Sequence, residues 1–438
     1  MKNVLIIFLL FYSTILNKVY SQWSDVQQGT NRAIEVFYVD SMSNLLFVGG
    51  QFSEAGGLNI NNIATWDGNV WNAFGNNEVF SSPGAVSAIV NYNGSIIVGG
   101  EFDSIGLKPV NNVAKWNGAG WENMGDGFDG SVEDLIVYND DLYACGFFSY
   151  SGSDFVECFA KWNGTNWERV SKLIGYANSF AKFNGELIVA GAFEHESSSS
   201  IKSIIGWNGI EIDTIFGYFN NAVISIRNYN DTLYAVGSFT SNLINPSNFI
   251  SLFYNQSWHS IGNPSGGLNW ITDVLKYNNV LYLCGYFTYP PDLGKFNGLN
   301  FDSVADVFGF LKVLIEYKGK LYVGGAFSKL NGQSISNIAK YNDLGNFVFK
   351  NNIGNGSVNV FPNPNHDGKF NLDLDIEKYV GKIKITIYSF DGNTIYSYES
   401  KVTSSNNFEI NILPVSGAYY LKCEINNSMI LVKKIIVL

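Results

Sequence analysis

The sequence predicts an all-β fold of repeated four-stranded modules, and two observations predict it. First, a strand of small and apolar residues ends seven times in glycine, any residue, phenylalanine, and successive phenylalanines lie 50, 46, 45, 46, 48 and 40 residues apart. Such a period is typical of a radial or linear array of supersecondary units. Second, 16% of residues are aromatic, only 15% are charged and 45 are glycine, which is the composition of a folded, turn-rich β protein. The motif residues are Gly50 and Phe52, Gly100 and Phe102, Gly146 and Phe148, Gly191 and Phe193, Gly237 and Phe239, Gly285 and Phe287, and Gly325 and Phe327.

Residues 1–21 have the pattern of a signal peptide. Lys2 precedes an apolar run from Val4 to Leu16, and small residues up to Ser21 predict cleavage before Gln22. A membrane anchor is the alternative. The apolar run is shorter than the ~20 residues that a spanning helix needs, and Lys18 ends it. The pattern therefore favours export over anchoring.

Residues 85–125 show how one repeat is built. Residues 85–92 alternate apolar and polar side chains, and Asn93-Gly94 is a strong two-residue hairpin signal. Residues 95–102 form a second strand that is apolar enough to be buried on both faces, and a polar loop connects it to a third strand at 112–116. Asn117-Gly118 then turns the chain into a fourth strand at 121–125. The repeat predicts a four-stranded antiparallel meander.

Seven such meanders over residues 22–350 predict a seven-bladed β-propeller, because stacking around an axis buries both faces of each sheet. A linear solenoid is the alternative, but it needs atypical capping repeats, which the sequence lacks. Trp23 to Gly29 reads as a fourth strand without the three before it, so it is expected to complete the last blade. Phe347 to Phe349 competes for that place, and the sequence leaves the closing strand open.

Aromatic residues flank the second turn of nearly every repeat, as Trp66 and Trp71 do in the first. A ring at one offset in each unit favours packing between units over a carbohydrate platform. Cys145 and Cys284 share a repeat position that holds small residues elsewhere, so they are expected to be buried apolar groups. A disulfide between Cys145 and Cys158 remains an open alternative.

The double glycine that ends the second strand, followed by a spaced aromatic pair, resembles kelch and related propeller repeats. Double glycines stand at Gly49-Gly50, Gly99-Gly100 and Gly324-Gly325. The aromatic pair differs from the usual kelch pattern, because its members are five residues apart and follow Asn-Ile-Ala or Asn-Val-Ala. The resemblance implies a propeller fold and implies no particular activity.

After a linker at 351–356 the period ends, and short alternating strands over 357–438 predict a small β-sandwich. This tail resembles the C-terminal sorting domain (type A) of the type IX secretion system. The resemblance implies contact with the outer-membrane secretion machinery, and a secreted protein or one on the outer-membrane surface of a Gram-negative bacterium. A carbohydrate-binding or adhesion sandwich is the alternative. The motif residues are Pro362, Asn363, Pro364, Gly368, Gly392, Gly417, Tyr419 and Lys433.

Ligand-binding residues are expected at one end of the ring. In a meander the tight Asn-Gly turns emerge at one end, while the longer second-to-third loops and the connections between modules emerge at the other. Aromatic, acidic and amide side chains in these connections favour a glycan or protein ligand. Trp270 is singled out because it lies outside the repeated tryptophan positions. The candidates are Trp270, Phe80, Phe128, Asp129, Tyr176, Tyr150 and Tyr289.

Charge and composition narrow the function classes. The net charge of −11 and isoelectric point near 4.8 disfavour nucleic acid and anionic membranes as partners. Only three histidines are present, His195, His259 and His366, and no nucleophile motif occurs, so we expect no metal, no cofactor and no catalytic residues. A non-catalytic binding protein is favoured. A hydrolase that uses two loop carboxylates and a structural surface-layer component are the alternatives.

Overall fold

The computed structural model divides the chain into two compact units, Trp23–Asn342 and the remainder. No α-helix occurs in the part of the chain that the structure describes, and the only helical turn there is the 3-10 segment η1 (Gly75–Asn77). The described residues are 23–81, 83–195, 198–213, 219–241, 249–261, 268–288, 291–296, 301–342, 356–361, 369–376, 381–389, 394–402, 407–411, 417–425 and 429–437.

The described residues of Trp23–Asn342 form seven antiparallel sheets that carry the seven repeats, here numbered sheet 1 to sheet 7. Sheet 1 contains β2 (Ile34–Asp40), β3 (Leu45–Gly50), β6 (Ile63–Trp66) and β7 (Trp71–Ala73). Sheet 2 contains β9 (Ala85–Tyr92), β10 (Ser95–Glu101), β13 (Val113–Trp116) and β14 (Trp121–Asn123). Sheet 3 contains β15 (Val132–Tyr138), β16 (Asp141–Gly146), β19 (Phe159–Trp162) and β20 (Trp167–Arg169).

The other four sheets continue the same strand order. Sheet 4 contains β21 (Leu173–Phe183), β22 (Glu186–His195), β23 (Ser198–Trp207) and β24 (Ile212–Asp213). Sheet 5 contains β25 (Val223–Tyr229), β26 (Thr232–Gly237), β27 (Ile250–Tyr254) and β28 (Ser257–Ser260). Sheet 6 contains β29 (Leu268–Tyr277), β30 (Val280–Thr288), β31 (Pro291–Phe296) and β32 (Phe301–Ala305). Sheet 7 contains β33 (Val307–Tyr317), β34 (Lys320–Leu330), β36 (Ile338–Tyr341) and β1 (Trp23–Asp25), with β35 (Gln333–Ser334) paired to β34.

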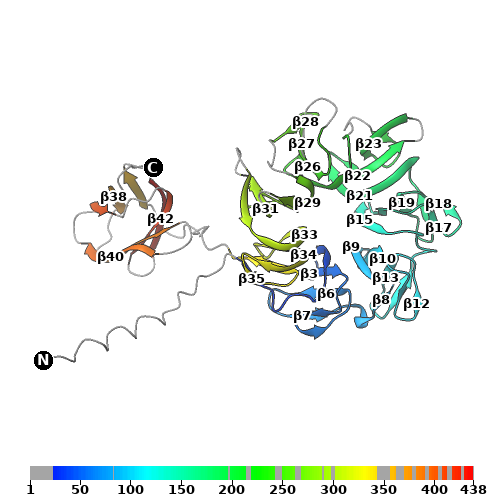
Figure 1. Ribbon diagram of the computed structural model, residues 1–438, viewed down its shortest axis with the longest axis horizontal. Coiled ribbons are helices and arrows are strands. Elements are labelled where there is room, and N and C mark those ends of the chain that lie inside the picture. The colour runs from blue at the N-terminus through cyan, green and yellow to red at the C-terminus, as the bar shows by residue number, and fades with distance from the viewer. Residues whose placement is uncertain are drawn as a thin grey trace. The chain divides into compact units, whose positions relative to one another are not determined.

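The sheets are arranged as a closed ring with the first strand of each at the centre, which is the architecture of a β-propeller (Figure 1). Each inner strand contacts the next, and β33 of sheet 7 contacts β2 of sheet 1. Of the two candidates for the closing strand, the structure pairs the one at Trp23: β1 is antiparallel to β36, and Trp23 lies opposite Tyr341. Residues 347–349 lie outside the described residues.

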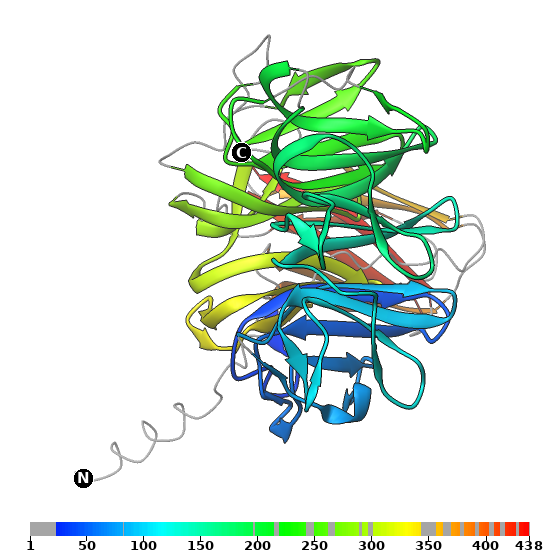
Figure 2. The same cartoon turned by 90° about the vertical axis from the view of Figure 1, so that its right-hand side faces the viewer.

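The strands run from one end of the ring to the other, so their turns gather at two ends (Figure 2). We call these the turn end, with the tight turns, and the connection end, with the longer segments. Contacts between connections support this grouping, because Ser81 pairs with Ser104 and Thr30 bridges to Ala55. The added strands are β4 (Glu54–Ala55), β5 (Leu58–Asn59), β8 (Phe80–Ser81), β11 (Ser104–Ile105), β12 (Lys108–Pro109), β17 (Tyr150–Ser151) and β18 (Asp154–Phe155).

The motif glycine is required because the inner strand approaches it closely. A Cβ atom on Gly100 would lie 1.9 Å from the carbonyl oxygen of Ala85, and one on Gly146 would lie 2.0 Å from that of Ser131. The inner strand is bulged beside this contact in every sheet. The motif phenylalanines whose side chains the structure describes are buried: Phe52, Phe102, Phe148, Phe193, Phe239 and Phe327.

The repeated tryptophans join neighbouring sheets, as their spacing predicts. Trp71 donates its indole N–H to the carbonyl of Val26 at 2.9 Å, and Trp167 donates to Met124 at 3.1 Å. In each case the acceptor follows the outer strand of the preceding sheet. These side chains are buried, so they serve packing and do not form a carbohydrate platform.

The cysteines are buried free thiols, including Cys145 and Cys158. Burial raises the pKa of the Cys158 thiol to about 12. These groups behave as small apolar residues, and no disulfide joins them.

The second unit contains two antiparallel sheets. The first is β37 (Gly356–Phe361), β38 (Lys369–Ile376) and β41 (Asn407–Asn411), and the second is β40 (Thr394–Val402), β39 (Gly381–Ser389), β42 (Gly417–Ile425) and β43 (Met429–Val437). Ile383, Ile385 and Ile387 are buried, as their alternation predicts. In the ladders Gly417 lies opposite Val437, and Lys433 opposite Leu421. Tyr419 pairs with both Ser389 and Ile435. Pro362, Asn363, Pro364, Gly368 and Gly392 lie outside the described residues.

Among the residues that the structure describes, no helix has the length and apolar character needed to cross a membrane.

Candidate functional site

The inner strands divide the seven sheets into two groups at the connection end. In sheets 1, 2, 3 and 5 the inner strand has 7 or 8 residues. In sheets 4, 6 and 7 it has 10 or 11 residues, because β21, β29 and β33 begin several residues earlier. Each of these three strands extends beyond the level of the motif glycine, where it forms a two-stranded ribbon with the second strand of its sheet.

In sheets 1, 3 and 5 one side chain just before the short inner strand accepts two backbone hydrogen bonds from the segment after the motif phenylalanine. We call this side chain the clamp. Asn31 Oδ1 accepts hydrogen bonds from the backbone N–H groups of Ser53 and Glu54 at 3.0 and 3.1 Å. Asp129 Oδ1 accepts the equivalent pair from Ser149 and Tyr150, both at 2.8 Å. Asn220 does the same for Thr240 and Ser241. In sheet 2 strand β8 pairs with β11 instead. The clamp satisfies two backbone N–H donors of the segment that follows the motif phenylalanine.

The long strands replace this clamp with backbone pairing. Ile174, Leu268 and Phe308 occupy the position of Asn31, Asp129 and Asn220, and an apolar side chain cannot accept a hydrogen bond. Instead Ile174 pairs with Glu194 and Phe308 with Lys329 in antiparallel ladders, and the second ladder shifts register after Phe308. The Phe308 side chain is 71% exposed, so its ring is not part of the core.

Aromatic rings gather where the long strands enter the ring. We define the portal position as the residue, in or directly before the inner strand, whose carbonyl oxygen faces the motif glycine. It is small in sheets 1, 2, 3 and 5 and aromatic in sheets 4, 6 and 7. The portal residues are, in order, Ala33, Ala85, Ser131, Tyr176, Ala222, Trp270 and Phe310.

Two of the aromatic portal residues, Tyr176 and Trp270, stack nearly parallel on a neighbouring ring. The ring centroids of Tyr176 and Phe147 are 4.4 Å apart with a 14° angle between planes, and those of Trp270 and Tyr286 are 5.5 Å apart with a 25° angle. Phe147 is 51% exposed, Tyr286 44% and Trp270 39%. We call these four residues the portal aromatics. Stacked rings with this much exposure present flat apolar surfaces to solvent.

Two of the seven predicted ligand residues, Trp270 and Tyr176, therefore lie at the portal, although no observation of a ligand tests their role. Tyr150 is exposed on the hairpin of β17 and β18, where its ring packs edge-on against Phe155 at 5.3 Å. Tyr289 lies outside the described residues.

The structure buries Phe80 and Phe128 in the core and places Asp129 in a loop clamp. Phe80 is buried against Phe102, with ring centroids 5.0 Å apart, and Phe128 is buried against Phe148 at 4.1 Å. Both plug the space beside the motif phenylalanine, as Phe219 does in sheet 5. Asp129 is one of the loop clamps, so its carboxylate is already bonded within the fold.

Phe147 and Tyr286 were missed by sequence reasoning. They are the middle residues of the Gly-x-Phe motif, where the other sheets carry Gln51, Glu101, Ala192, Ser238 and Ala326. The signal was present, because an aromatic side chain at the variable position of a structural motif is not explained by the motif.

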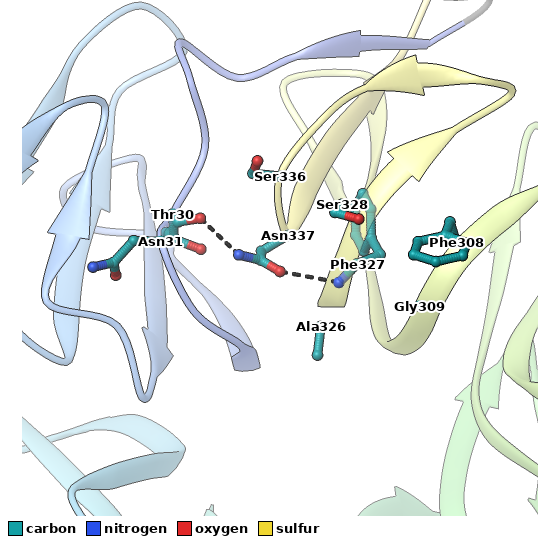
Figure 3. Close-up of a pocket in the computed structure, with 9 residues that line it drawn as sticks. All are labelled: Thr30, Asn31, Phe308, Gly309, Ala326, Phe327, Ser328, Ser336 and Asn337. Carbon is teal, nitrogen blue, oxygen red and sulfur yellow. Dashed lines mark hydrogen bonds between the residues drawn. The ribbon is translucent and has the colours of Figure 1, made fainter.

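A hollow of about 420 Å³ lies at the connection end of sheet 7, beside Phe308 and Phe327 (Figure 3). The side-chain amides of Asn31 and Asn337, which line this hollow, are hydrogen-bonded within the protein. Asn337 accepts the N–H of Phe327 at 3.0 Å and donates to the carbonyl of Thr30 at 2.6 Å, which ties sheet 7 to the segment after β1. Asn31 is a clamp. Thr30 donates its hydroxyl group to the carbonyl of Arg32 at 2.8 Å, so three of the five polar side chains that line this hollow are already hydrogen-bonded within the fold.

A buried polar network joins the inner strands of sheets 3 to 7. Asp273 accepts hydrogen bonds from Leu314 N at 3.0 Å, Ser225 Oγ at 3.1 Å and Val274 N at 2.9 Å. It also forms a two-point ion pair with Arg227, at 3.0 and 3.3 Å. Asp134 accepts from Phe180 N and Leu135 N, both at 2.8 Å. These carboxylates are bonded to the backbone of the next sheet.

Burial raises the pKa of Asp134 to about 6, although the backbone donors and the charge of Arg227 oppose the shift. The charge of Asp273 raises the pKa of Arg227 above its usual value. Both effects follow from the placement of charges between packed sheets.

No group of three or more His, Cys, Asp or Glu side chains capable of holding a metal ion occurs among the described residues.

Comparison with known families identifies the tail and part of the ring. Residues 359–438 match the secretion system C-terminal sorting domain, and residues 319–346 match a family described as "Domain of unknown function (DUF5122) beta-propeller". The sorting domain indicates that the chain is secreted through the type IX system or attached to the cell surface, and that its tail interacts with the secretion machinery. No curated protein matches this chain.

Among solved structures, the chain is similar to the crystal structure of dimeric latent PorU from Porphyromonas gingivalis. The match has 12% sequence identity and a TM-score of 0.17, and it covers 81% of this chain and 32% of that chain. The chain thus spans about a third of that protein, and a likeness at this TM-score carries no argument for its fold or function.

Proposed function

We propose that this protein is a non-catalytic binding module, exported through the type IX secretion system, which holds a glycan or protein ligand at the connection end of its ring. The observation that carries the proposal is the portal: three equivalent positions bear Tyr176, Trp270 and Phe310, and two of these rings stack in exposed pairs. Exposed aromatic groups of this kind are enriched at binding surfaces.

The proposal includes the finer architecture. Each of sheets 1 to 7 is one blade of a seven-bladed, kelch-like propeller, residues 1–21 are a cleaved signal peptide, and the two tail sheets form a sandwich. The inner-strand contacts and the β1–β36 pairing support the blade assignment. Mass spectrometry of the secreted protein checks the cleavage, with Gln22 expected as the first residue.

The carboxylates of the inner strands, Asp134 and Asp273, do not supply the carboxylate pair of the hydrolase alternative, which leaves that role to the loops. Asp134 and Asp273 accept hydrogen bonds from Phe180 N and Leu314 N of the following sheets, and Asp273 is also paired with Arg227. A general acid and base need carboxyl groups free to exchange protons with a substrate. A purely structural surface-layer role is weakened by the exposed rings, since a role without ligands does not require them.

The proposal is tested with the secreted protein on arrays of glycans and of extracellular proteins. We expect binding by the wild type and its loss in a Phe147→Ala, Trp270→Ala double variant. Tyr254→Ala is the matched control, because Tyr254 is 39% exposed, as Trp270 is, but ends β27 at the turn end. Equal binding by all three proteins would contradict the proposal, as would turnover of an arrayed glycan.

The export route is tested by deleting residues 351–438. The unit Trp23–Asn342 has its own closed set of sheets, so we expect it to remain folded but to accumulate in the periplasm. Normal delivery of the truncated protein to the surface or medium would contradict the route.

A further inference from the structure

The flat rings of the portal aromatics face solvent in pairs whose geometry is fixed. Tyr176 enters from β21 and stacks on Phe147, which follows β16 of the preceding sheet, while Trp270 of β29 stacks on Tyr286 of β30 in the same sheet. Each ring thus has one face covered by its partner. A ligand that packs on such a pair meets a surface whose orientation is already set, which lowers the entropy lost on binding.

Sheet 5 separates the two pairs and carries only small groups at the same level. Its portal residue is Ala222, which is buried, and the middle residue of its motif is Ser238. No large side chain of sheet 5 at these positions covers the rings of sheets 4 and 6. A single ligand that contacts both pairs therefore has to extend across sheet 5.

Two basic side chains of the inner strands are paired within the protein. Lys312, on the inner strand of sheet 7, forms an ion pair with Glu35 of sheet 1, and Arg227 is paired with Asp273. The whole chain has 27 basic and 38 acidic residues. A polyanionic ligand would meet net repulsion and no free cation among these groups, so the charges favour a neutral ligand.

The backbone at the portal pairs on one side with the second strand of each sheet, and the inner strands contact one another around the ring axis. Tyr176 pairs with Ala192, Trp270 with Tyr286 and Phe310 with Ala326 in antiparallel ladders. A peptide that binds as an added strand needs unpaired N–H and C=O groups at a sheet edge. Recognition here falls on ring faces, which suit the flat C–H face of a pyranose ring.

We propose that the portal aromatics bind a neutral polysaccharide, with one sugar ring on the Phe147–Tyr176 pair, another on the Trp270–Tyr286 pair, and the intervening sugars across sheet 5. The inference rests on the proposed binding function and deepens it by assigning the ligand class and the residues that contact it. The proposed binding is non-covalent and involves no chemical reaction.

The test is affinity electrophoresis of the full secreted chain in gels containing soluble β-glucan, xylan, mannan, galactomannan or α-glucan, with alginate as the polyanionic contrast. We expect at least one neutral polysaccharide to retard the wild type, and alginate not to. Trp270→Ala and Tyr176→Ala should each weaken that affinity about tenfold or more, since loss of one central aromatic contact usually has such an effect. Tyr254→Ala should leave it unchanged.

Length dependence checks the two-pair arrangement. Disaccharides of the retained polysaccharide should compete poorly, whereas longer oligosaccharides should compete progressively better until both pairs are occupied. Competition that is complete with the disaccharide would overturn the arrangement across sheet 5.

The outcomes separate the two proposals. Binding of a protein on the array, with loss in Trp270→Ala but no retardation by any neutral polysaccharide, would overturn this inference and leave the binding function standing. Retardation that is equal in Trp270→Ala and Tyr254→Ala would overturn the portal site itself. Circular dichroism of each variant shows whether the fold is intact before affinities are compared.

Discussion

Sheets 3 and 4 are neighbours with the same strand order, yet they treat the connection end in opposite ways. In sheet 3 the chain enters through Asp129, whose carboxylate accepts two loop N–H groups, and the inner strand is short. In sheet 4 Ile174 stands at the same position, and the strand extends as a ribbon paired to Glu194. At this position a polar acceptor accompanies a clamped loop, whereas an apolar residue accompanies an extended ribbon. The ribbons of sheets 4 and 6 bear Tyr176, Trp270 and Tyr286, and sheet 3 supplies Phe147.

The largest expected effect concerns a device that both kinds of sheet share. Asn337 in sheet 7 and Asn112 in sheet 2 each accept the N–H of the motif phenylalanine and donate to a carbonyl of the next connection. Asn337→Ala should lower the free energy of unfolding by about 2–3 kcal/mol, because it leaves buried donors and acceptors unpaired. Urea denaturation followed by tryptophan fluorescence measures this. A loss as small as that of an exposed substitution would show that the amide does not hold the ring.

The clamp itself should have a smaller effect. Asp129→Ala should lower the free energy of unfolding by about 1–2 kcal/mol, since two loop N–H groups lose their acceptor. Asp129→Asn is the matched control and should be nearly neutral, because asparagine holds the same position at Asn31 and Asn220. If the two variants unfold alike, the carboxylate oxygen is not the stabilising group.

The partly buried carboxyl group of Asp134 distinguishes the inner strand of sheet 3 from those of sheets 1, 2 and 7, where Val36, Ala88 and Val313 hold the equivalent position. Its pKa is raised to about 6 in the folded protein, against about 4 in an unfolded chain. The folded state thus binds more protons between these values. Its stability falls as pH rises through this window, and the full cost is present above pH 6.

Asp134→Asn removes this dependence. Relative to the wild type, the variant should gain of order 1 kcal/mol in free energy of unfolding between pH 4.5 and pH 7.5, on top of a constant loss from its missing acceptor oxygen. Paired denaturation curves at the two pH values measure the change. A difference that does not vary with pH, or that varies in the opposite direction, would contradict the raised pKa.

The smallest effect is expected at the ribbon counterpart of the clamp. Phe308→Ala should change the free energy of unfolding by less than about 0.5 kcal/mol, because its side chain is largely exposed and its backbone remains paired with Lys329. The same denaturation assay that detects the loss in Asp129→Ala serves as its comparison. A loss of similar size in both variants would remove the distinction between the two kinds of sheet.

Much of the repeated part of the structure could be predicted from the sequence. Gly-x-Phe spacing located the sheets and Asn-Gly turns located the hairpins, because each is a local signal repeated at a fixed offset, whereas the strand at Trp23 was only one of two candidates for closing the ring. The tail motif likewise placed the sorting domain. These features depend on short-range backbone chemistry, which a single sequence displays.

The site was harder to predict because exposure depends on neighbouring sheets. Phe80 and Phe128 lie in connections, yet each packs beside a motif phenylalanine some twenty residues later in the sequence. Phe147 and Tyr286 lie inside a structural motif, yet they face solvent. Comparing the residue at the position of Asn31 in all repeats would have shown that Ile174, Leu268 and Phe308 are apolar where the clamps are polar. That difference would have identified the repeats with ribbons.

Hydrogen–deuterium exchange of the secreted chain, with and without a saturating polysaccharide retained in the gel assay, tests the central claim that ligand binds where the long strands enter the ring. The account predicts added protection in the first residues of β21 and β29 and in the segment around Phe147, with no change at the turns after β6 and β13. Protection confined to those turns, or to the clamped hairpins of sheets 1 and 2, would contradict it.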